Sequence, residues 1–194
     1  VTLHNSAYWT QDYEKCNGVI VRGVKVYSQA NWNNDGLDID SRNVVVSDCY
    51  IDCDDDALCL KSDTDTPCEN VTVTNCVLKS NCNAIKFGTS SYSGFKNVTI
   101  SNCTIDRASE DHIRQWYKNY PWIGTKHKTV VAGIALESVD GGIIENVSIS
   151  DIAMQGVQTP IFVRLGDRKR TFSKQMSRIN DVMISRIVAR SEGK

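Results

Sequence analysis

Acidic residues at two places in the chain have the types and the spacing that chemistry requires. Asp54, Asp55 and Asp56 are consecutive, and Asp35 lies 19 residues before Asp54. Carboxylates that converge repel one another when all of them are ionised. A site that gathers them therefore works either as a paired acid and base, with the pKa of one member raised, or as oxygen ligands for a hard cation such as Ca²⁺.

A third interpretation of the same residues involves no chemistry. The consecutive aspartates could equally form a solvated turn whose side chains point apart. The position of Asp35 decides between the interpretations, because a solvated turn needs no partner from a separate part of the chain. Where Asp35 lies depends on the repeat that carries both groups.

The chain repeats itself at intervals of about 27 residues. Cys49, Cys76 and Cys103 are each 27 residues apart, and each ends the same phrase, which begins with Asn-Val and alternates Val or Ile with polar residues. Looser copies of the phrase begin at Asn17, Asn146 and Asp181. The copies show the period of strands and no helical period. A repeat of this length predicts an all-β fold, a parallel β-helix in which each copy forms one coil.

The periodic residues have packing roles in such a fold. Cysteines at the repeat interval would form an inward column, because a free thiol behaves as a small buried hydrophobe. A disulfide stays open among the cysteines that do not follow the interval, Cys53, Cys68 and Cys82. The asparagine that opens each copy suits a left-handed turn, and its amide is able to bond to the equivalent residue of the next coil.

A second short strand follows each copy, and its alternating side chains point to opposite faces. The inward pairs are Leu37/Ile39, Leu58/Leu60, Ile85/Phe87, Ile134/Leu136 and Ile161/Val163. The outward residues form three columns: Asp35, Asp56, Asn83, Ala132 and Thr159; Asp38, Cys59, Lys86, Ala135 and Phe162; and Asp40, Lys61, Gly88, Glu137 and Arg164. This alignment places Asp35 beside Asp56, with Asp55 next to them, and argues against a simple solvated turn.

The two acidic segments resemble motifs of glycoside hydrolase family 28, the polygalacturonases. Asn33-Asn34-Asp35-Gly36-Leu37-Asp38 is similar to the family's Asn-Thr-Asp-Gly-(Ile/Leu)-Asp motif. Asp54-Asp55-Asp56-Ala57-Leu58-Cys59-Leu60 is similar to its Gly-Asp-Asp-x-(Ile/Leu)-Ala-(Ile/Leu) motif. The resemblance extends over Val1 to Arg190, and the family's fold is a right-handed parallel β-helix.

The resemblance implies inverting hydrolysis of a glycosidic bond in a pectic polysaccharide or oligosaccharide. By the family pattern, Asp55 would be the general acid, and Asp35 and Asp56 would hold and deprotonate the attacking water. Crowding by two anions would raise the pKa of Asp55, as a general acid at neutral pH requires.

The chain departs from the family at two motifs that bind substrate. The Gly-His-Gly motif falls on Cys82-Asn83-Ala84, and the Arg-Ile-Lys motif falls on Ala135-Leu136-Glu137. We expect the substrate-binding residues on this face to be Asn83, Lys86, Lys61, Glu137 and Arg164. Two of these residues have an alternative role in ion pairs on the surface of the sheet, Lys61 with Asp40 and Arg164 with Glu137. The departures favour a less charged or decorated pectic substrate.

An insertion interrupts the repeat between Asn97 and Asn146, and its extra residues fall at 106–129. Solenoids place such insertions on loops beside the binding face. Trp116 and Trp122 lie in this segment. Their rings are expected either to stack on sugar rings as a subsite wall or to form a small satellite core under the loop.

Composition limits the remaining possibilities. Lys and Arg total 22, and Asp and Glu total 23, so the net charge of −1 excludes nucleic-acid binding based on bulk charge. No apolar run is long enough for a helix that spans a membrane. We expect a single domain over 1–194 that lacks N-terminal coils, a monomer without cofactor or metal, and an extracellular or periplasmic location that follows from the substrate class.

Two other functions remain open from the sequence. A non-catalytic carbohydrate-binding β-helix would keep the fold and the aromatic residues but would not need converging aspartates. A β-helix polysaccharide lyase would use Ca²⁺ and a basic residue, for which Lys61 and Lys86 are the candidates.

Overall fold

The structure is a computed structural model that describes residues 1–31, 33–109, 130–169 and 175–191. These residues form β-strands, turns and loops, without a helix among them. The strands are β1 (Thr2–His4), β2 (Asp12–Arg22), β3 (Lys25–Ser28), β4 (Leu37–Ser47), β5 (Tyr50–Cys53), β6 (Leu58–Ser62), β7 (Cys68–Thr74), β8 (Val77–Ser80), β9 (Asn83–Ser91), β10 (Phe95–Arg107), β11 (Val130–Ser138), β12 (Ile143–Leu165) and β13 (Arg178–Ser191). Within the same ranges, no helix exists that could cross a membrane.

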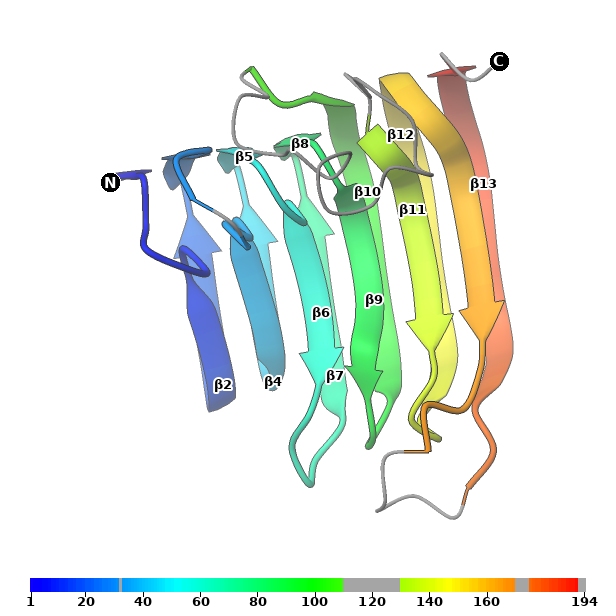
Figure 1. Cartoon of the computed structure of the whole chain (residues 1–194). Helices are drawn as coiled ribbons and strands as arrows, with labels where there is room; N and C mark the ends of the chain where they lie inside the picture. Colours follow the sequence, from blue (N-terminus) through cyan, green and yellow to red (C-terminus); the bar gives the residue numbers. More distant parts are fainter. Residues whose placement is uncertain (32, 110–129, 170–174, 192–194) are drawn as a thin grey trace.

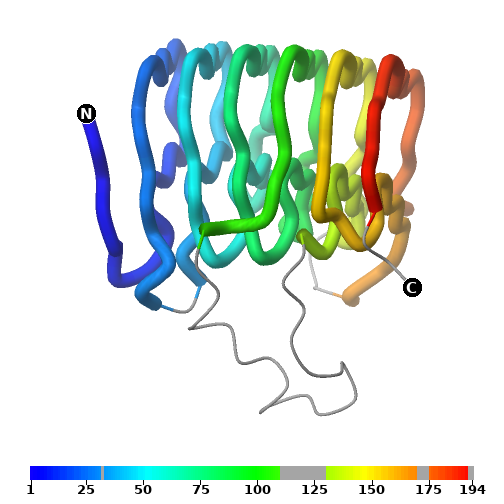
Figure 2. The backbone as a smooth tube through the Cα atoms, turned by 90° about the horizontal axis from the view of Figure 1, so that it is seen from above, coloured from blue at the N-terminus to red at the C-terminus, as the bar shows by residue number. Residues whose placement is uncertain are grey.

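The strands pair in parallel with strands from the next copy of the repeat (Figure 1). One row of pairs joins β4, β7, β10, β12 and β13, and another joins β4, β6, β9, β11 and β12. The first row aligns Val44, Val71, Val98, Val147 and Val182. In Figure 2 the chain accordingly winds through successive turns that lie side by side. The expected all-β architecture with parallel strands is confirmed.

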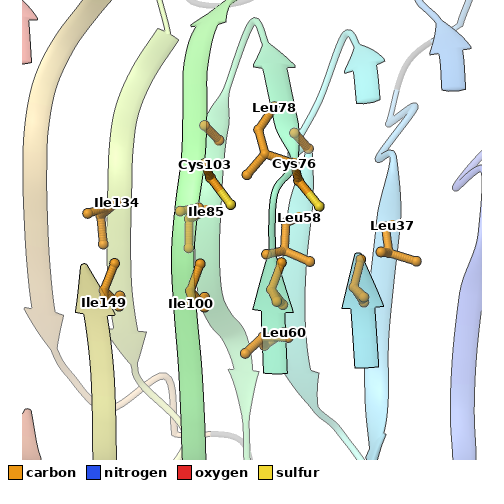
Figure 3. Close-up of a cluster of buried hydrophobic side chains, with 14 of the residues drawn as sticks. Leu37, Leu58, Leu60, Cys76, Leu78, Ile85, Ile100, Cys103, Ile134 and Ile149 are labelled. Atoms are coloured by element: carbon orange, nitrogen blue, oxygen red, sulfur yellow. The ribbon is translucent and has the colours of Figure 1, made fainter. Parts of the chain in front are cut away.

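The core lies between the rows of strands and consists of the inward side chains. Figure 3 shows Leu37, Leu58, Ile85 and Ile134 pointing into this interior, together with residues of the opposite row. The expected inward pairs are buried, with two exceptions. Ile161 is 42% exposed and Val163 is 54% exposed. They are exposed because β12 has no described partner on its outer side beyond Val157.

The cysteines are thiols, as the repeat predicts. All eight are free, and Cys49, Cys76 and Cys103 are buried in equivalent positions of successive coils. The amide of Val77 bonds to the carbonyl of Cys49, and the amide of Thr104 bonds to the carbonyl of Cys76, so the column is continuous. The disulfide that was left open among Cys53, Cys68 and Cys82 is not present.

The asparagines of the repeat form a hydrogen-bonded ladder along one edge. Each side-chain amide donates to the amide oxygen of the preceding member: Asn43 to Asn17 at 2.6 Å, Asn70 to Asn43 at 2.9 Å, Asn97 to Asn70 at 3.0 Å and Asn146 to Asn97 at 2.7 Å. The four donors all have positive φ angles, between 53° and 56°. Asn accepts this left-handed conformation more readily than most residues. The ladder asparagines therefore both form the turn and hydrogen-bond to the neighbouring coil.

Candidate active site

Backbone pairing between two coils brings the acidic segments together. The amide of Gly36 donates to the carbonyl of Asp56 at 2.8 Å, and the amide of Leu37 donates to the carbonyl of Ala57 at 3.0 Å. A Cβ atom on Gly36 would lie 2.2 Å from Cγ2 of Ile51, so only glycine permits this close approach. Asp35, just before β4, therefore lies beside the turn between β5 and β6 that carries Asp56.

Four aspartates gather at this point, and all are withdrawn from solvent. Asp35 is 4% exposed, Asp55 is 9% exposed, Asp56 is 2% exposed and Asp38 is completely buried. Asp38 was not among the site residues expected from the sequence. The signal that could have found it was its position at the head of the column that contains Lys86. A solvated turn is excluded, because its carboxylates would be exposed.

Asp56 is surrounded by hydrogen-bond donors. Its Oδ1 atom accepts from the backbone amide of Asn83 at 3.1 Å and from the side-chain amide at 2.7 Å. Its Oδ2 atom accepts from Nζ of Lys86 at 2.9 Å. Burial alone would raise the pKa of Asp56, but the charge of Lys86 and these hydrogen bonds hold that pKa below its usual value. Asp56 is therefore ionised at neutral pH.

Asp35 has the opposite environment. Burial is the largest cause, and the negative charges of Asp38, Asp55 and Asp56 add to it, so that the pKa of Asp35 is raised to about 9. At neutral pH Asp35 therefore carries a proton. The resemblance assigned Asp35 to the attacking water and expected the raised pKa on Asp55. The pKa of Asp35 is raised by its burial first and by the neighbouring carboxylates second. The raised pKa expected on Asp55 stays a prediction.

Lys61 lies between two of these carboxyls. Its Nζ atom is 3.0 Å from Oδ1 of Asp38 and 3.5 Å from Oδ2 of Asp35. The alternative role of Lys61, an ion pair with Asp40, is wrong in its partner. Asp40 instead accepts hydrogen bonds from the amide of Asp63 at 2.8 Å and the hydroxyl of Thr64 at 3.3 Å.

The ring of Trp9 covers Lys61, with Nζ 4.5 Å from the ring centroid. Trp9 belongs to a loop that hydrogen-bonds to the segment that carries Asp35. The amide of Thr10 donates to the carbonyl of Asp35 at 2.8 Å, and the side-chain amide of Asn34 donates to the carbonyl of Tyr8 at 2.9 Å. Trp9 itself is 36% exposed and forms part of the surface beside the cluster.

The other expected binding residues lie further along the same face. Glu137 on β11 is in register with Arg164 on β12, and their charged atoms are 3.8 Å apart. This ion pair is the alternative role that the columns predicted. Trp116 and Trp122 lie outside the described residues, as does most of the expected insertion.

Two groups of side chains contain carboxylates and a thiol close enough together to be considered as metal ligands. Asp35, Asp38 and Cys59 form one group, and Asp55, Asp56 and Cys82 form the other, each with its donor atoms within 4.8 Å of one another. An ammonium group already contacts each group, and thiol sulfur is a poor ligand for Ca²⁺. The donors therefore do not fit the hard cation that was one of the original interpretations.

The arrangement has the chemical character of an acid and base site. One buried carboxyl, Asp35, holds a proton, and its neighbour Asp56 is ionised. Environments that push the pKa values of adjacent carboxyls apart are the usual basis of acid and base assignments. Asp55 lies next to both and is the most exposed of the three.

Comparison with known proteins supports the fold. No protein family model matches the chain, and no curated protein sequence matches it. Among solved structures, the chain is similar to the polygalacturonase from Erwinia carotovora ssp. carotovora, with a TM-score of 0.65 and 15% sequence identity. The match covers 97% of this chain and 53% of that chain, so this chain spans about half its length. At this identity the likeness shows the fold.

Proposed function

We propose that the protein is an inverting glycoside hydrolase of the polygalacturonase type, a divergent member of glycoside hydrolase family 28 with a right-handed parallel β-helix. The observation that carries the proposal is the convergence of Asp35, Asp55 and Asp56, with Asp35 protonated and Asp56 ionised. The likeness in fold to a polygalacturonase supports the same reaction class.

Inverting hydrolysis divides two roles between the carboxyl groups. One protonated carboxyl gives its proton to the leaving glycosidic oxygen, and one carboxylate accepts a proton from the water that attacks the anomeric carbon. The two groups must stand about 6.5–9.5 Å apart to leave room for that water. A buried, crowded cluster keeps one member protonated at the pH where the other is ionised.

The charges around the cluster favour a substrate with little negative charge at the scissile bond. Lys61 and Lys86 both contact carboxylates of this chain, and Glu137 stands where the family has a lysine. The side chains available to a substrate carboxylate are therefore anionic or already paired. We propose a decorated or less charged pectic glycan as the substrate, with Asn83 and Arg164 as further contacts.

We further propose that the enzyme acts as a monomer outside the cytoplasm, in the extracellular space or the periplasm, where pectic polymers are accessible to it. No cofactor is needed for hydrolysis by two carboxyl groups. These statements follow from the proposed substrate class.

The test is hydrolysis of a panel of pectic polysaccharides and oligosaccharides, followed by reducing ends and by the anomer of the product. We expect the wild type to release an inverted sugar and Asp55→Asn to lower the rate by about 10²-fold or more. Asp48→Asn is the matched control. Asp48 is exposed and pairs with Arg22, and the equivalent position of the repeat, 27 residues later, already holds an asparagine, Asn75.

Loss of rate in Asp55→Asn alone supports the proposal. If no glycan is cleaved while both variants and the wild type still bind one, the protein is a carbohydrate-binding β-helix. An unsaturated product that absorbs ultraviolet light would instead identify a lyase.

A further inference from the structure

Two aromatic side chains beside the acidic cluster are open to solvent and have no part in the reaction as described above. Tyr8 is 51% exposed and Trp9 is 36% exposed. Their ring centroids are 5.1 Å apart and their planes are inclined by 37°, so the two rings form one aromatic surface, the Tyr8–Trp9 platform. Adjacent aromatic rings left in contact with water beside a polar site are typical of a ligand-binding surface.

The platform is joined to the cluster through Lys61. Its Nζ atom is 4.5 Å from the ring centroid of Trp9 and 3.5 Å from Oδ2 of Asp35. The ammonium group covers one face of the indole, and the exposed fraction of Trp9 shows that another part of the ring reaches solvent. A ligand that stacks there lies beside the carboxyl groups of the cluster.

The loop that carries the platform is fixed by the segment that carries Asp35. The side-chain amide of Asn33 donates to the hydroxyl of Tyr8 at 3.1 Å, and that of Asn34, which is completely buried, donates to the carbonyl of Tyr8 at 2.9 Å. The carbonyl of Asp35 accepts from the amide of Thr10 at 2.8 Å. Three consecutive residues therefore position both a carboxyl of the cluster and the platform. A binding surface that is ordered in advance loses less entropy when its ligand binds.

The order of the coils places the platform and the carboxyls in one line along the face. The loop that carries the platform leads into β2, which pairs with β4, and β4 pairs in turn with β6. Asp35 precedes β4 and Asp56 precedes β6. A glycan chain that lies across the coils therefore meets the platform first and the carboxyls next.

The chemistry of the platform suits a pyranose ring. A pyranose carries its hydroxyl groups at the rim and C–H groups on its faces, so it can lay an apolar face on an aromatic ring while its hydroxyls stay solvated. Tyr and Trp supply large, rigid contact areas at a low cost in side-chain entropy, and each also has a polar group for a hydrogen bond.

We propose that the Tyr8–Trp9 platform is a sugar-binding subsite, on which a pyranose ring of the glycan stacks on the side of the cluster that faces the preceding coil. The inference rests on the proposed glycosidase function and deepens it. The roles of Asp35, Asp55 and Asp56 stay as described under the proposed function, because the platform binds a sugar and takes no part in bond cleavage.

The first experiment measures binding without turnover, in the Asp55→Asn background. The probes are partly methyl-esterified oligogalacturonides and rhamnogalacturonan oligosaccharides, followed by calorimetry and by tryptophan fluorescence. We expect Tyr8→Ala and Trp9→Ala each to raise Kd about tenfold, because each removes a stacking face. Tyr8→Phe and Trp9→Phe keep an aromatic ring and should retain most of the affinity. The fluorescence change on binding should be lost in Trp9→Phe.

The second experiment separates a binding role from a structural one. Tyr8→Ala, with Asp55 intact, should raise KM about tenfold and leave kcat nearly unchanged, the result of removing binding that substrate and transition state share. A loop that only supported the cluster would lower kcat instead, because it is hydrogen-bonded to Asp35. Tyr50→Ala is the matched control. It removes a ring from a second tyrosine pair, Tyr27 and Tyr50 on β3 and β5, and should leave Kd and KM unchanged.

The outcomes distinguish this inference from the proposed function. Unchanged Kd in both alanine variants overturns the subsite, and cleavage by the wild type then still supports the hydrolase. Weaker binding in both variants together with no cleavage by the wild type supports the subsite and refutes the hydrolase. If Trp9→Ala fails to fold, Tyr8→Ala gives the reading. A lower kcat with an unchanged Kd in Tyr8→Ala would show that the loop only holds the cluster in place and would contradict the proposal.

Discussion

At the scale of single residues, the neighbouring charges decide which carboxyl is protonated and which is ionised. Asp35 and Asp56 are chemically identical and lie beside each other, but Asp56 is bonded to Lys86 and Asn83 while Asp35 is faced by other aspartates. The side-chain amide of Asn83 cannot transfer a proton. It donates two hydrogen bonds to Asp56 and so helps to hold that group ionised.

Replacing Lys86 by methionine tests the ionised state of Asp56. The pKa of Asp56 is held low chiefly by Lys86 against the effect of burial, so it should rise in the variant. A base works only when ionised, and the acidic limb of kcat/KM should therefore move to higher pH. The rate profile of Lys86→Met is compared with that of Lys96→Met, and a lower rate without any displacement of the acidic limb would show that Lys86 serves another purpose.

At the scale of elements, the turns of the repeat keep neighbouring coils in register. The ladder asparagines have φ angles near 55° and bond to one another across coils. The same register aligns Leu37 with Leu58, and these two residues follow Asp35 and Asp56 by two positions in the sequence. A turn that lost its geometry would therefore disturb the spacing of coils that brings Asp35 to Asp56.

Asn70 is the place to measure this contribution, because it both donates to Asn43 and accepts from Asn97. Asn70→Ala loses both hydrogen bonds and places alanine in a left-handed conformation, which costs about 1–2 kcal/mol by itself. We expect the free energy of unfolding, measured with urea, to fall by about 2 kcal/mol. Asn70→Gly is the control, since it loses the bonds without the backbone strain and should fall by less.

At the scale of the whole molecule, the site lowers the stability of the fold over part of the pH range. The cluster is assembled from separate coils only when the chain folds, and folding moves the pKa of Asp35 from about 3.9 to about 9. A carboxyl whose pKa is raised on folding stabilises the folded state most below its unfolded pKa. That contribution is lost as pH rises from about 4 to about 9.

Asp35→Asn should remove this dependence. The melting temperature of the wild type is expected to decline between pH 5 and pH 8 more steeply than that of the variant, and the variant should be more stable at pH 8 by about 1 kcal/mol or more. Asp48→Asn provides the matched control at an exposed position. If the melting temperatures of the wild type and Asp35→Asn change equally with pH across this range, Asp35 is not protonated in the folded protein.

The sequence by itself determined the all-β class with parallel strands and three members of the cluster, Asp35, Asp55 and Asp56, but not Asp38. The interval between Cys49, Cys76 and Cys103 predicted stacked coils, since residues that recur in step occupy equivalent places when coils repeat. Alternation along the short strands then separated inward from outward side chains, and this placed Asp35 beside Asp56. Those steps depend on local geometry that every coil shares, which is why a single sequence is sufficient for them.

Only the tertiary structure decided how the charges pair. The alternative ion pair of Lys61 was placed with Asp40, but Lys61 contacts Asp38 and Asp35, and the pKa of Asp35 is raised. A column gives the order of residues but not where a long side chain ends, and burial by the Trp9 loop is not visible in the repeat. Protonation depends on the sum of all neighbouring charges and on exclusion of water, and both exist only when the coils and loops are assembled.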